Sequence, residues 1–239
     1  MGSQIVLQVR ELAESLERVV FVGVIHTDRD SVERARKIVK RVKPDVVAVE
    51  LDRERYQQMM HPPTQEEIAR MAPTGDPVQD LFYQIALLEK KLGDITGSDA
   101  GAEMLAAIKE GRSIGAKIAL VDRPIQATMQ AIMNVPLDEV YRMFNMMPGA
   151  SKEIQEGGAQ DLLSLLKEEG AVDTVMEEFR AQFPNLSNAL IQERDNYVAK
   201  ALFTILNDVE GRIVAVLGAG HIEGVKQSLA RMLQTQAGA

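Results

Sequence analysis

The sequence RVVFVGVIH at residues 18–26 has a near copy, RIVAVLGAGH, at residues 212–221. In each copy a basic residue precedes a mostly β-branched apolar run, and a glycine stands three positions before a histidine. Short uninterrupted apolar runs are typical of strands buried on both faces of a parallel sheet. The chain has three histidines. Two of these histidines end copies of one sequence motif. This repetition indicates either a feature of the fold or a functional site.

Two further segments have the same strand pattern, DVVAVEL at 45–51 and KIALVDRPI at 117–125. Between the first two strands, SVERARKIVKRV at 31–42 has its apolar residues at helical spacing. Strand, helix and strand within about thirty residues predict a unit with parallel strands.

Helical patterns dominate much of the remaining chain, and NLSNALIQERDNYVAKALFTIL at 185–206 predicts its longest helix. We therefore predict an α/β fold with a small, mainly parallel sheet of about four core strands and flanking helices. A large helical insertion is expected at about 77–207, within a single domain spanning 1–239.

The composition restricts the function classes. A net charge of −8 and a pI near 5.1 argue against nucleic acid as the main partner. The absence of cysteine excludes disulfides, thiolate metal sites and a cysteine nucleophile. No segment reaches the ~18 to 20 apolar residues needed to span a bilayer. We expect a cytoplasmic location, or membrane association through a segment absent from this chain.

Polar side chains follow all four predicted strands, and the carboxyl ends of parallel strands meet at one edge of a sheet, where ligands collect. In chain order they are His26; Glu50, with Arg55 shortly after; Asp122 and Arg123; and His221. This shared edge predicts a ligand site.

Two imidazoles and a carboxylate are the ligand set of a divalent metal with open positions. We expect His26, His221 and either Glu50 or Asp122 to hold a metal, which would lower the pKa of a bound water. If Glu50 is not a ligand, it would be the general base. Each residue also has a structural interpretation, because a histidine there can cap a helix and a glutamate can pair with an arginine. His61, in loop-like sequence, is not expected to take part.

Arg194 lies in the long predicted helix on the same face as Leu190, Tyr197 and Ala201, so we expect it to point inward. There it would bind a substrate carboxylate or an oxyanion, or form an ion pair with a strand-end carboxylate. The residues alone favour neither interpretation.

Two familiar site motifs are missing from the sequence. Gly218, Gly220 and Gly224 lack the spacing of a dinucleotide-binding loop, and no Walker-type lysine is present. A serine-hydrolase elbow, G-x-S-x-G, does not occur either.

The chain resembles the TraB/PrgY family of pheromone-shutdown proteins, within the Tiki/TraB superfamily of proposed metalloproteases. The resemblance covers almost the full chain in the expected order. It rests on GVIH at 23–26, PDVVAVELDRER at 44–55, GAEM at 101–104, LVDRPI at 120–125, ERDNYVA at 193–199 and GAGHIEGV at 218–225.

The resemblance implies a Tiki/TraB/ChaN-like fold, two G-x-x-H motifs and a glutamate at the end of the second strand. The matching positions here are His26, Glu50 and His221, with Arg55, Arg123 and Arg194 as accompanying basic residues. Proteolytic members of the superfamily are proposed to need manganese or cobalt, and zinc also suits these donors. One departure is Asp195, where the family often has asparagine. Many relatives carry a C-terminal membrane region that this chain lacks.

The leading hypothesis is a metal-dependent, metallopeptidase-like hydrolase that acts on a peptide or a small amide or ester. Its substrate-binding residues would be Arg55, Asp122, Arg123 and Arg194, with the three arginines also steadying the oxyanion. The alternative is a non-catalytic regulatory protein of the pheromone-shutdown type that sequesters a peptide or ligand. A third hypothesis treats the histidines as helix caps in an assembly protein. The methionine-rich stretches 57–60 and 143–147 suit either core packing or a homodimer interface.

Overall fold

The computed structural model describes residues 14–61, 75–96 and 98–237. Its centre is one four-stranded, fully parallel sheet with the strand order β1–β4–β2–β3. The strands are β1 (Val19–Val24), β2 (Val46–Val49), β3 (Lys117–Leu120) and β4 (Ile213–Gly218). The predicted α/β fold with a small parallel sheet is confirmed.

The two copies of the opening phrase form neighbouring strands. Val19 of β1 lies opposite Ile213 of β4, and Val24 lies opposite Gly218. Strand β4 therefore separates β1 from β2, although β1 and β2 are consecutive in the sequence. This order brings the histidines of the two copies to one edge of the sheet.

The central and the edge strands differ in burial. Every residue of β4 and β2 is buried, whereas β1 and β3 at the two edges are partly exposed. Strand β3 also ends at Leu120, before the end of the predicted segment 117–125. The amides of Val121 and Asp122 still donate to the carbonyls of Val49 and Leu51 beyond that end. Pro124, which has no N–H for a sheet ladder, then directly precedes helix α7 (Ile125–Met133).

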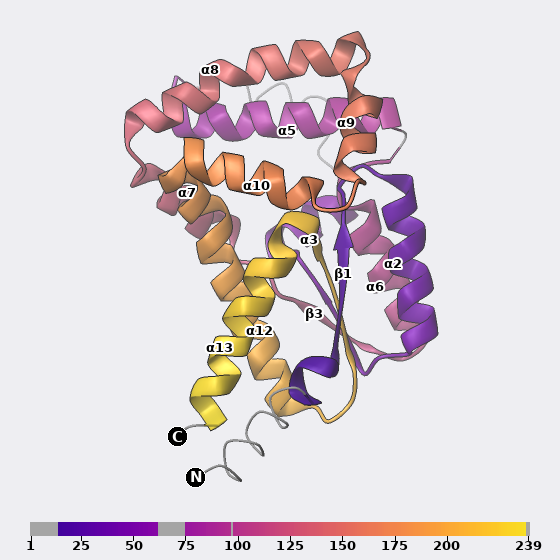
Figure 1. The fold of residues 1–239 in the computed structure, drawn as a ribbon. Helices are drawn as coiled ribbons and strands as arrows, with labels where there is room; N and C mark the ends of the chain where they lie inside the picture. The colour runs from indigo at the N-terminus through magenta and orange to yellow at the C-terminus, as the bar shows by residue number, and fades with distance from the viewer. Residues whose placement is uncertain (1–13, 62–74, 97, 238–239) are drawn as a thin grey trace.

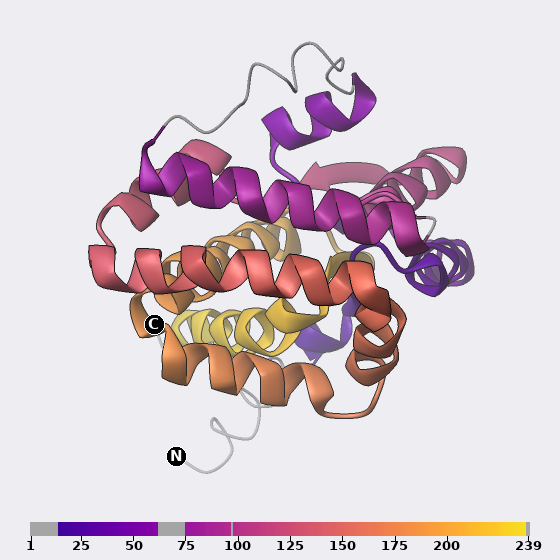
Figure 2. The same ribbon diagram turned by 90° about the horizontal axis from the view of Figure 1, so that it is seen from above.

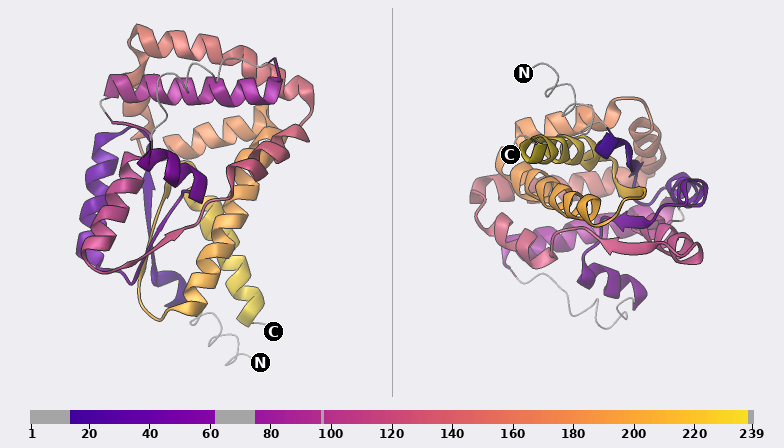
Figure 3. Two further views of the ribbon diagram at one scale, coloured as in Figure 1. Left: turned by 180° about the vertical axis from the view of Figure 1, so that it is seen from behind. Right: turned by 90° about the horizontal axis from the view of Figure 1, so that it is seen from below.

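Two pairs of helices cover the two faces of the sheet, as the views from the front and from behind show (Figures 1 and 3). Helices α2 (Arg29–Val42) and α6 (Ala102–Ser113) pack on one face through an apolar cluster that includes Val214 and Val216 of β4. Helices α12 (Glu193–Asp208) and α13 (Ile222–Ala237) pack on the other face with Ile213, Ala215 and Leu217. Burial on both faces explains why the strand sequences are uninterrupted apolar runs.

Further helices lie beyond the carboxyl ends of the strands, where α5, α8, α9 and α10 cross above the sheet (Figures 1 and 2). Residues of α5, α8 and α10 contribute to a separate apolar cluster, called the upper apolar cluster here, which includes Leu81, Val140 and Leu186. Strand β3 lies within the sequence range of the expected insertion. The remaining elements are α3 (Arg53–Met60), α5 (Pro77–Thr96), α8 (Leu137–Glu153), η1 (Ile154–Gly158), α9 (Ala159–Leu166), α10 (Ala171–Gln182), α11 (Pro184–Ser187), η2 (Asn188–Gln192) and η3 (Ala219–His221).

The long helix expected at 185–206 is present but contains a π-helical turn. It forms as α11, the π turn η2 and α12 in succession. The carbonyls of Ala189 and Leu190 in η2 accept hydrogen bonds from Arg123 and Arg194. π turns are frequent at functional sites, and this one immediately precedes Arg194.

None of the described helices is long and apolar enough to cross a bilayer. The methionine-rich stretches divide between two environments. Met147 is buried in the upper apolar cluster, whereas Met60 and Met146 are exposed. Core packing thus accounts for part of these stretches, and the homodimer stays a prediction.

Substituting Gly111, where α6 crosses the sheet, should destabilise the protein. A Cβ there would lie 2.8 Å from Val47 Cγ2 and 3.0 Å from Ile118 Cδ1. We expect Gly111→Ala to lower the free energy of unfolding by about 1 to 2 kcal/mol, because overpacking outweighs the better helix propensity of alanine. Urea unfolding followed by circular dichroism measures this change.

Gly149→Ala is the matched control, because Gly149 also lies inside a helix and a Cβ there would meet nothing within 4 Å. It should leave the free energy of unfolding unchanged or raise it slightly. Equal effects of the two substitutions would contradict the tight packing at Gly111.

Candidate functional site

His26 is fixed from behind by a buried carboxylate. It follows β1 and comes before Thr27, a buried β-branched residue held at a φ of 66°. The imidazole Nδ1 lies 2.7 Å from Oε1 of Glu103, which is fully buried on α6, and 43% of the His26 side chain is exposed. Left-handed backbone is rare for such residues and gathers at functional sites.

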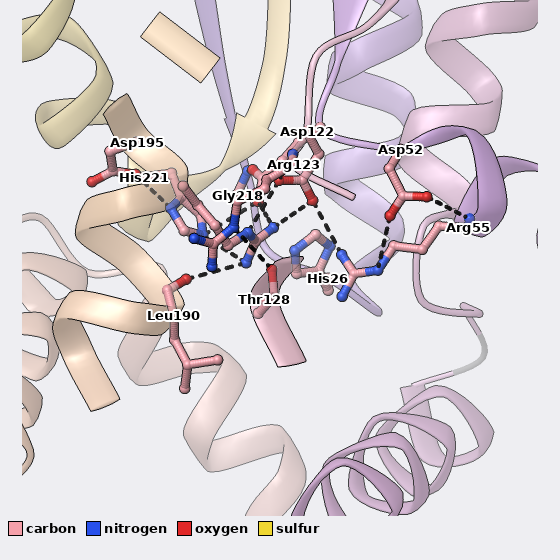
Figure 4. Close-up of polar contacts among 12 residues, drawn as sticks. His26, Asp52, Arg55, Asp122, Arg123, Thr128, Leu190, Asp195, Gly218 and His221 are labelled. Carbon is pink, nitrogen blue, oxygen red and sulfur yellow. Dashed lines mark hydrogen bonds and ion pairs between the residues drawn. The ribbon is translucent and has the colours of Figure 1, made fainter. Parts of the chain in front are cut away.

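His221 has the same kind of support. It ends the short helix η3 directly after β4, and its Nδ1 lies 2.6 Å from Oδ1 of Asp195 on α12 (Figure 4). Its Nε2 lies 3.3 Å from Oε1 of Glu50. Each histidine of the repeated phrase therefore has its Nδ1 against a carboxylate supplied by a helix.

Glu50 lies between the two histidines on the buried side of the site. It follows β2 and accepts a 2.7 Å hydrogen bond at Oε2 from the amide of Gly218. A Cβ at Gly218 would lie 3.3 Å from His26 Nε2, 3.4 Å from His221 Cδ2 and 3.5 Å from Glu50 Oε2. All three predicted metal ligands thus meet at one corner of the site, where they approach Gly218 closely because residue 218 has no side chain.

Arg194 points into this edge, although Tyr197, which was expected on the same inward face, is exposed. Its Nη2 donates to Glu50 Oε1 at 2.6 Å and to Asp122 Oδ2 at 2.7 Å, and its Nε donates to Asp122 Oδ1 at 3.1 Å. Its Nη1 lies 3.5 Å from both the Leu190 carbonyl and His221 Nε2. The ion pair with Glu50 and Asp122 is therefore present, and the Nη1 group makes only long contacts.

Arg55 lies at the rim of the site. Its Nη1 donates to the buried Asp122 Oδ2 at 3.3 Å, and its Nε lies 4.0 Å from Asp52, which caps α3 (Figure 4). The Arg55 side chain is 39% exposed. Asp122 is thus enclosed by two guanidinium groups, and Arg55 is the more accessible of them.

Arg123 points elsewhere. Its side chain donates to Thr128 Oγ1 at 3.2 Å and to the Ala189 carbonyl at 2.7 Å, and it pairs with Glu193 at 2.5 Å. These contacts fasten β3 to α7 and η2. They give no support to a role of Arg123 in substrate binding, which stays a prediction.

His61 stands at the far end of α3, eight residues after the start of that helix at Arg53. At 1.5 Å per residue this is about 12 Å along the helix axis. Its side chain is exposed. This position agrees with the expectation that His61 takes no part.

Burial and charge in the site shift the pKa values of Glu50, His221 and Asp195. Burial opposes ionisation of Glu50, but His221, Arg194, His26 and the Gly218 amide outweigh it and lower its pKa from 4.5 to about 2. Burial opposes protonation of His221, but Glu50 and Asp195 raise its pKa. Burial also raises the pKa of Asp195. Glu50 is therefore a carboxylate, and a proton between His221 and Asp195 is held firmly.

Negative charge is in excess in this network. Five carboxylates contact the two histidines and the two arginines Arg55 and Arg194, so neutral imidazoles would leave three negative charges. The carboxylates are those of Glu50, Asp52, Glu103, Asp122 and Asp195. Protonated imidazoles or a bound cation would offset this excess.

The donor chemistry fits a divalent metal ion. Metal-binding histidines almost always place their second ring nitrogen against a carboxylate or carbonyl, as His26 and His221 both do. The two imidazoles and Glu50 meet at the corner formed by Gly218. Within residues 14–61, 75–96 and 98–237, however, no three His, Asp or Glu side chains are already grouped at metal-binding distances. The Arg194 guanidinium is the cation that contacts Glu50 here.

A sequence profile of the TraB/PrgY/gumN family matches residues 8–237. The chain belongs to the TraB/PrgY/gumN family. An uncharacterized protein of Methanocaldococcus jannaschii is 30% identical over 220 residues, which are 90% of this chain and 54% of that protein. TraB domain-containing proteins of Homo sapiens and Bos taurus are 27% and 28% identical, over 94% of this chain and 66% of each relative. The chain thus spans about half to two thirds of the length of these curated relatives.

Two carboxylates of this TraB-family site escaped the sequence-based assignment of roles. In the sequence, Glu103 stands out only as part of the GAEM motif, and Asp195 only as a departure from asparagine. A signal for Glu103 exists, because it shares one buried helix face with Ala107 and Gly111, where a charged residue is rarely unpaired. Asp195 adjoins the inward-pointing Arg194, but the sequence does not show that His221 lies opposite.

Acid should destabilise the protein partly through Glu50. Its pKa is about 2 when folded and 4.5 in the reference state, so the unfolded chain binds the proton more readily. The stabilisation by Glu50 is complete above pH 4.5 and is lost as the pH falls toward 2. In chelator-treated protein, we expect Glu50→Gln to flatten the decline of the free energy of unfolding across that window.

Urea titrations at successive pH values measure this dependence. Glu223→Gln is the control, since Glu223 is exposed and pairs only with its helical neighbour Lys226. It should leave the slope of the wild type unchanged. Parallel curves for wild type and Glu50→Gln would contradict the lowered pKa.

Proposed function

We propose that this TraB-family chain is a metal-dependent hydrolase that acts on a peptide or another amide or ester. The observation that carries the proposal is the paired support of the histidines. Both imidazoles have Nδ1 against a buried carboxylate and adjoin the corner at Gly218. This support fixes ring orientation and raises ligand basicity, which structural helix caps do not need.

His26 and His221 would hold the metal, with Glu50 as the third donor. A divalent ion such as manganese, cobalt or zinc would lower the pKa of a bound water and polarise the scissile carbonyl. A general base works best with a pKa near the working pH. Because the pKa of Glu50 is about 2, its carboxylate suits a ligand or charge partner better than a base.

The arginines would orient the substrate. Nη1 of Arg194 makes only 3.5 Å contacts, so it has capacity to donate to a developing oxyanion. Arg55 is partly exposed at the rim and has one 3.3 Å bond to Asp122. It would bind a substrate carboxylate, since a guanidinium matches the geometry of that group.

The second candidate is a non-catalytic protein that sequesters a peptide. It is favoured by Arg194, which neutralises part of the charge of Glu50 and Asp122 without a metal. The same histidines and arginines would then be contacts for the bound peptide. A peptide library incubated with the manganese-loaded protein distinguishes the candidates. Cleavage products that disappear in Glu50→Gln support hydrolysis, and retention of intact peptides supports sequestration.

Metal binding should depend on the two site histidines and on the carboxylates behind them. In calorimetric titrations with manganese, cobalt and zinc, we expect the wild type to bind one equivalent and His26→Ala or His221→Ala to lose measurable binding. Glu103→Gln and Asp195→Asn should weaken binding by about 10- to 100-fold, because they remove the charge that supports each imidazole.

His61→Ala is the matched control, because it removes the third histidine without touching the site, and it should bind metal like the wild type. Absence of stoichiometric binding by the wild type, or equal losses in all three histidine variants, would refute the proposed metal site.

A further inference from the structure

Residues 159–182, which comprise α9 and α10 and are called the arm here, lie above the level of the strand ends on the β1 side of the sheet. Figure 1 shows α10 above the end of β1 and the start of α13, and Figure 2, seen from above, shows α10 running alongside α13. The arm follows η1, where the helical backbone is interrupted by a kink at Gly157, which has a φ of 115°. Gly170, at 77°, separates its two helices.

Two contacts tie the arm to the site, one near each histidine. Nζ of Lys167 lies 2.9 Å from Asp28 and 2.7 Å from Asp30, at the start of α2 just after His26. Met176 packs against Gly220, beside His221, where an added Cβ would lie 2.9 Å from its sulfur. The arm thus spans the site from one histidine to the other.

The rest of the arm is weakly packed. Helix α10 has no buried residue, and Ala159 is the buried residue of α9. A Cβ at Gly157 or Gly170 would meet nothing within 4 Å, so both glycines border open space. Segments with few buried apolar contacts open at low free-energy cost.

The two ends of the arm are held differently. At the end of α10, Phe179 packs on the buried Phe183 with ring centroids 5.6 Å apart, within the upper apolar cluster. At the turn between the helices, Lys167 connects the arm to the sheet layer through its ion pairs with Asp28 and Asp30. Lys167 is also the only basic residue between Lys152 and Arg180 in an otherwise acidic stretch. Partly exposed ion pairs of this kind are weak and screened by salt.

We propose that the arm is a hinged cover of the site, with Lys167 as the latch and Met176 as the contact that closes over the His221 side. The turn between α9 and α10 lifts when Lys167 leaves Asp28 and Asp30, while the Phe179 end stays anchored. Its role in admitting substrate rests on the proposed function, whereas the opening itself does not.

Hydrogen exchange followed by mass spectrometry tests the latch in chelator-treated protein, so the result does not depend on metal binding or turnover. We expect Lys167→Met to speed exchange in peptides from 159–182 by about two- to fivefold, the effect of losing a weak ion-pair contact. Exchange in β2 and β4 should not change. Oxidation of Met176 by dilute peroxide should accelerate to a similar extent.

Three comparisons make the test specific. Lys167→Arg should restore wild-type exchange. Lys152→Met removes a lysine that pairs with Glu156, and both residues precede the arm in the sequence. This substitution should have no effect on exchange in the arm. Asp30→Asn removes a highly exposed partner of the latch, and should give a smaller increase. It serves as the independent variant if Lys167→Met does not fold.

Unchanged exchange of the arm in both Lys167→Met and Asp30→Asn would overturn the proposal. So would an equal increase in Lys152→Met, or an increase spread over the whole sheet. If the Lys167 variants behave as expected but the protein binds no metal, the proposed cover is supported and only the proposed hydrolase function is refuted.

Discussion

The buried guanidinium of Arg194 connects the layers of this fold at the carboxyl edge of its sheet. It binds Glu50 after β2 and Asp122 after β3, and Glu50 in turn accepts from the amide of Gly218 at the end of β4. One helix is thereby joined to three strands through charged groups withdrawn from water. Removing one partner of such a buried pair typically costs about 3 to 5 kcal/mol, because the other charge is left uncompensated.

The same connection defines the chemistry available to the site. The cation that holds Glu50 ionised is also the competitor of any metal for that carboxylate. The two site histidines are less affected by this competition. Glu103 and Asp195 contact Nδ1 of His26 and His221, so these carboxylates do not occupy Nε2 of either ring. Because Arg194 occupies Glu50, the two imidazoles would be the main donors of the proposed metal site.

Much of this could be predicted from the sequence, because strands buried on both faces leave continuous apolar runs and polar residues after them mark the ligand edge. The order of the strands could not, since nothing local to 212–221 shows that β4 pairs with both β1 and β2. The direction in which Arg123 points could not be predicted either. It depends on a carbonyl of the π turn η2, and no sequence pattern indicates that turn. The partnership of Glu103 with His26 required two elements 77 positions apart to be placed together.

The place of β4 in the sheet has a consequence for how the chain folds. The strand that pairs with both β1 and β2 is the last of the four along the sequence. During synthesis, some 160 residues or more are therefore added after β1 and β2 before β4, the strand that pairs with both, is made. Pairings of such large sequence separation form slowly, since the entropy of closing the loop is lost before any contact is gained. Until β4 has been made, the edges of β1 and β2 that face it have no partner strand.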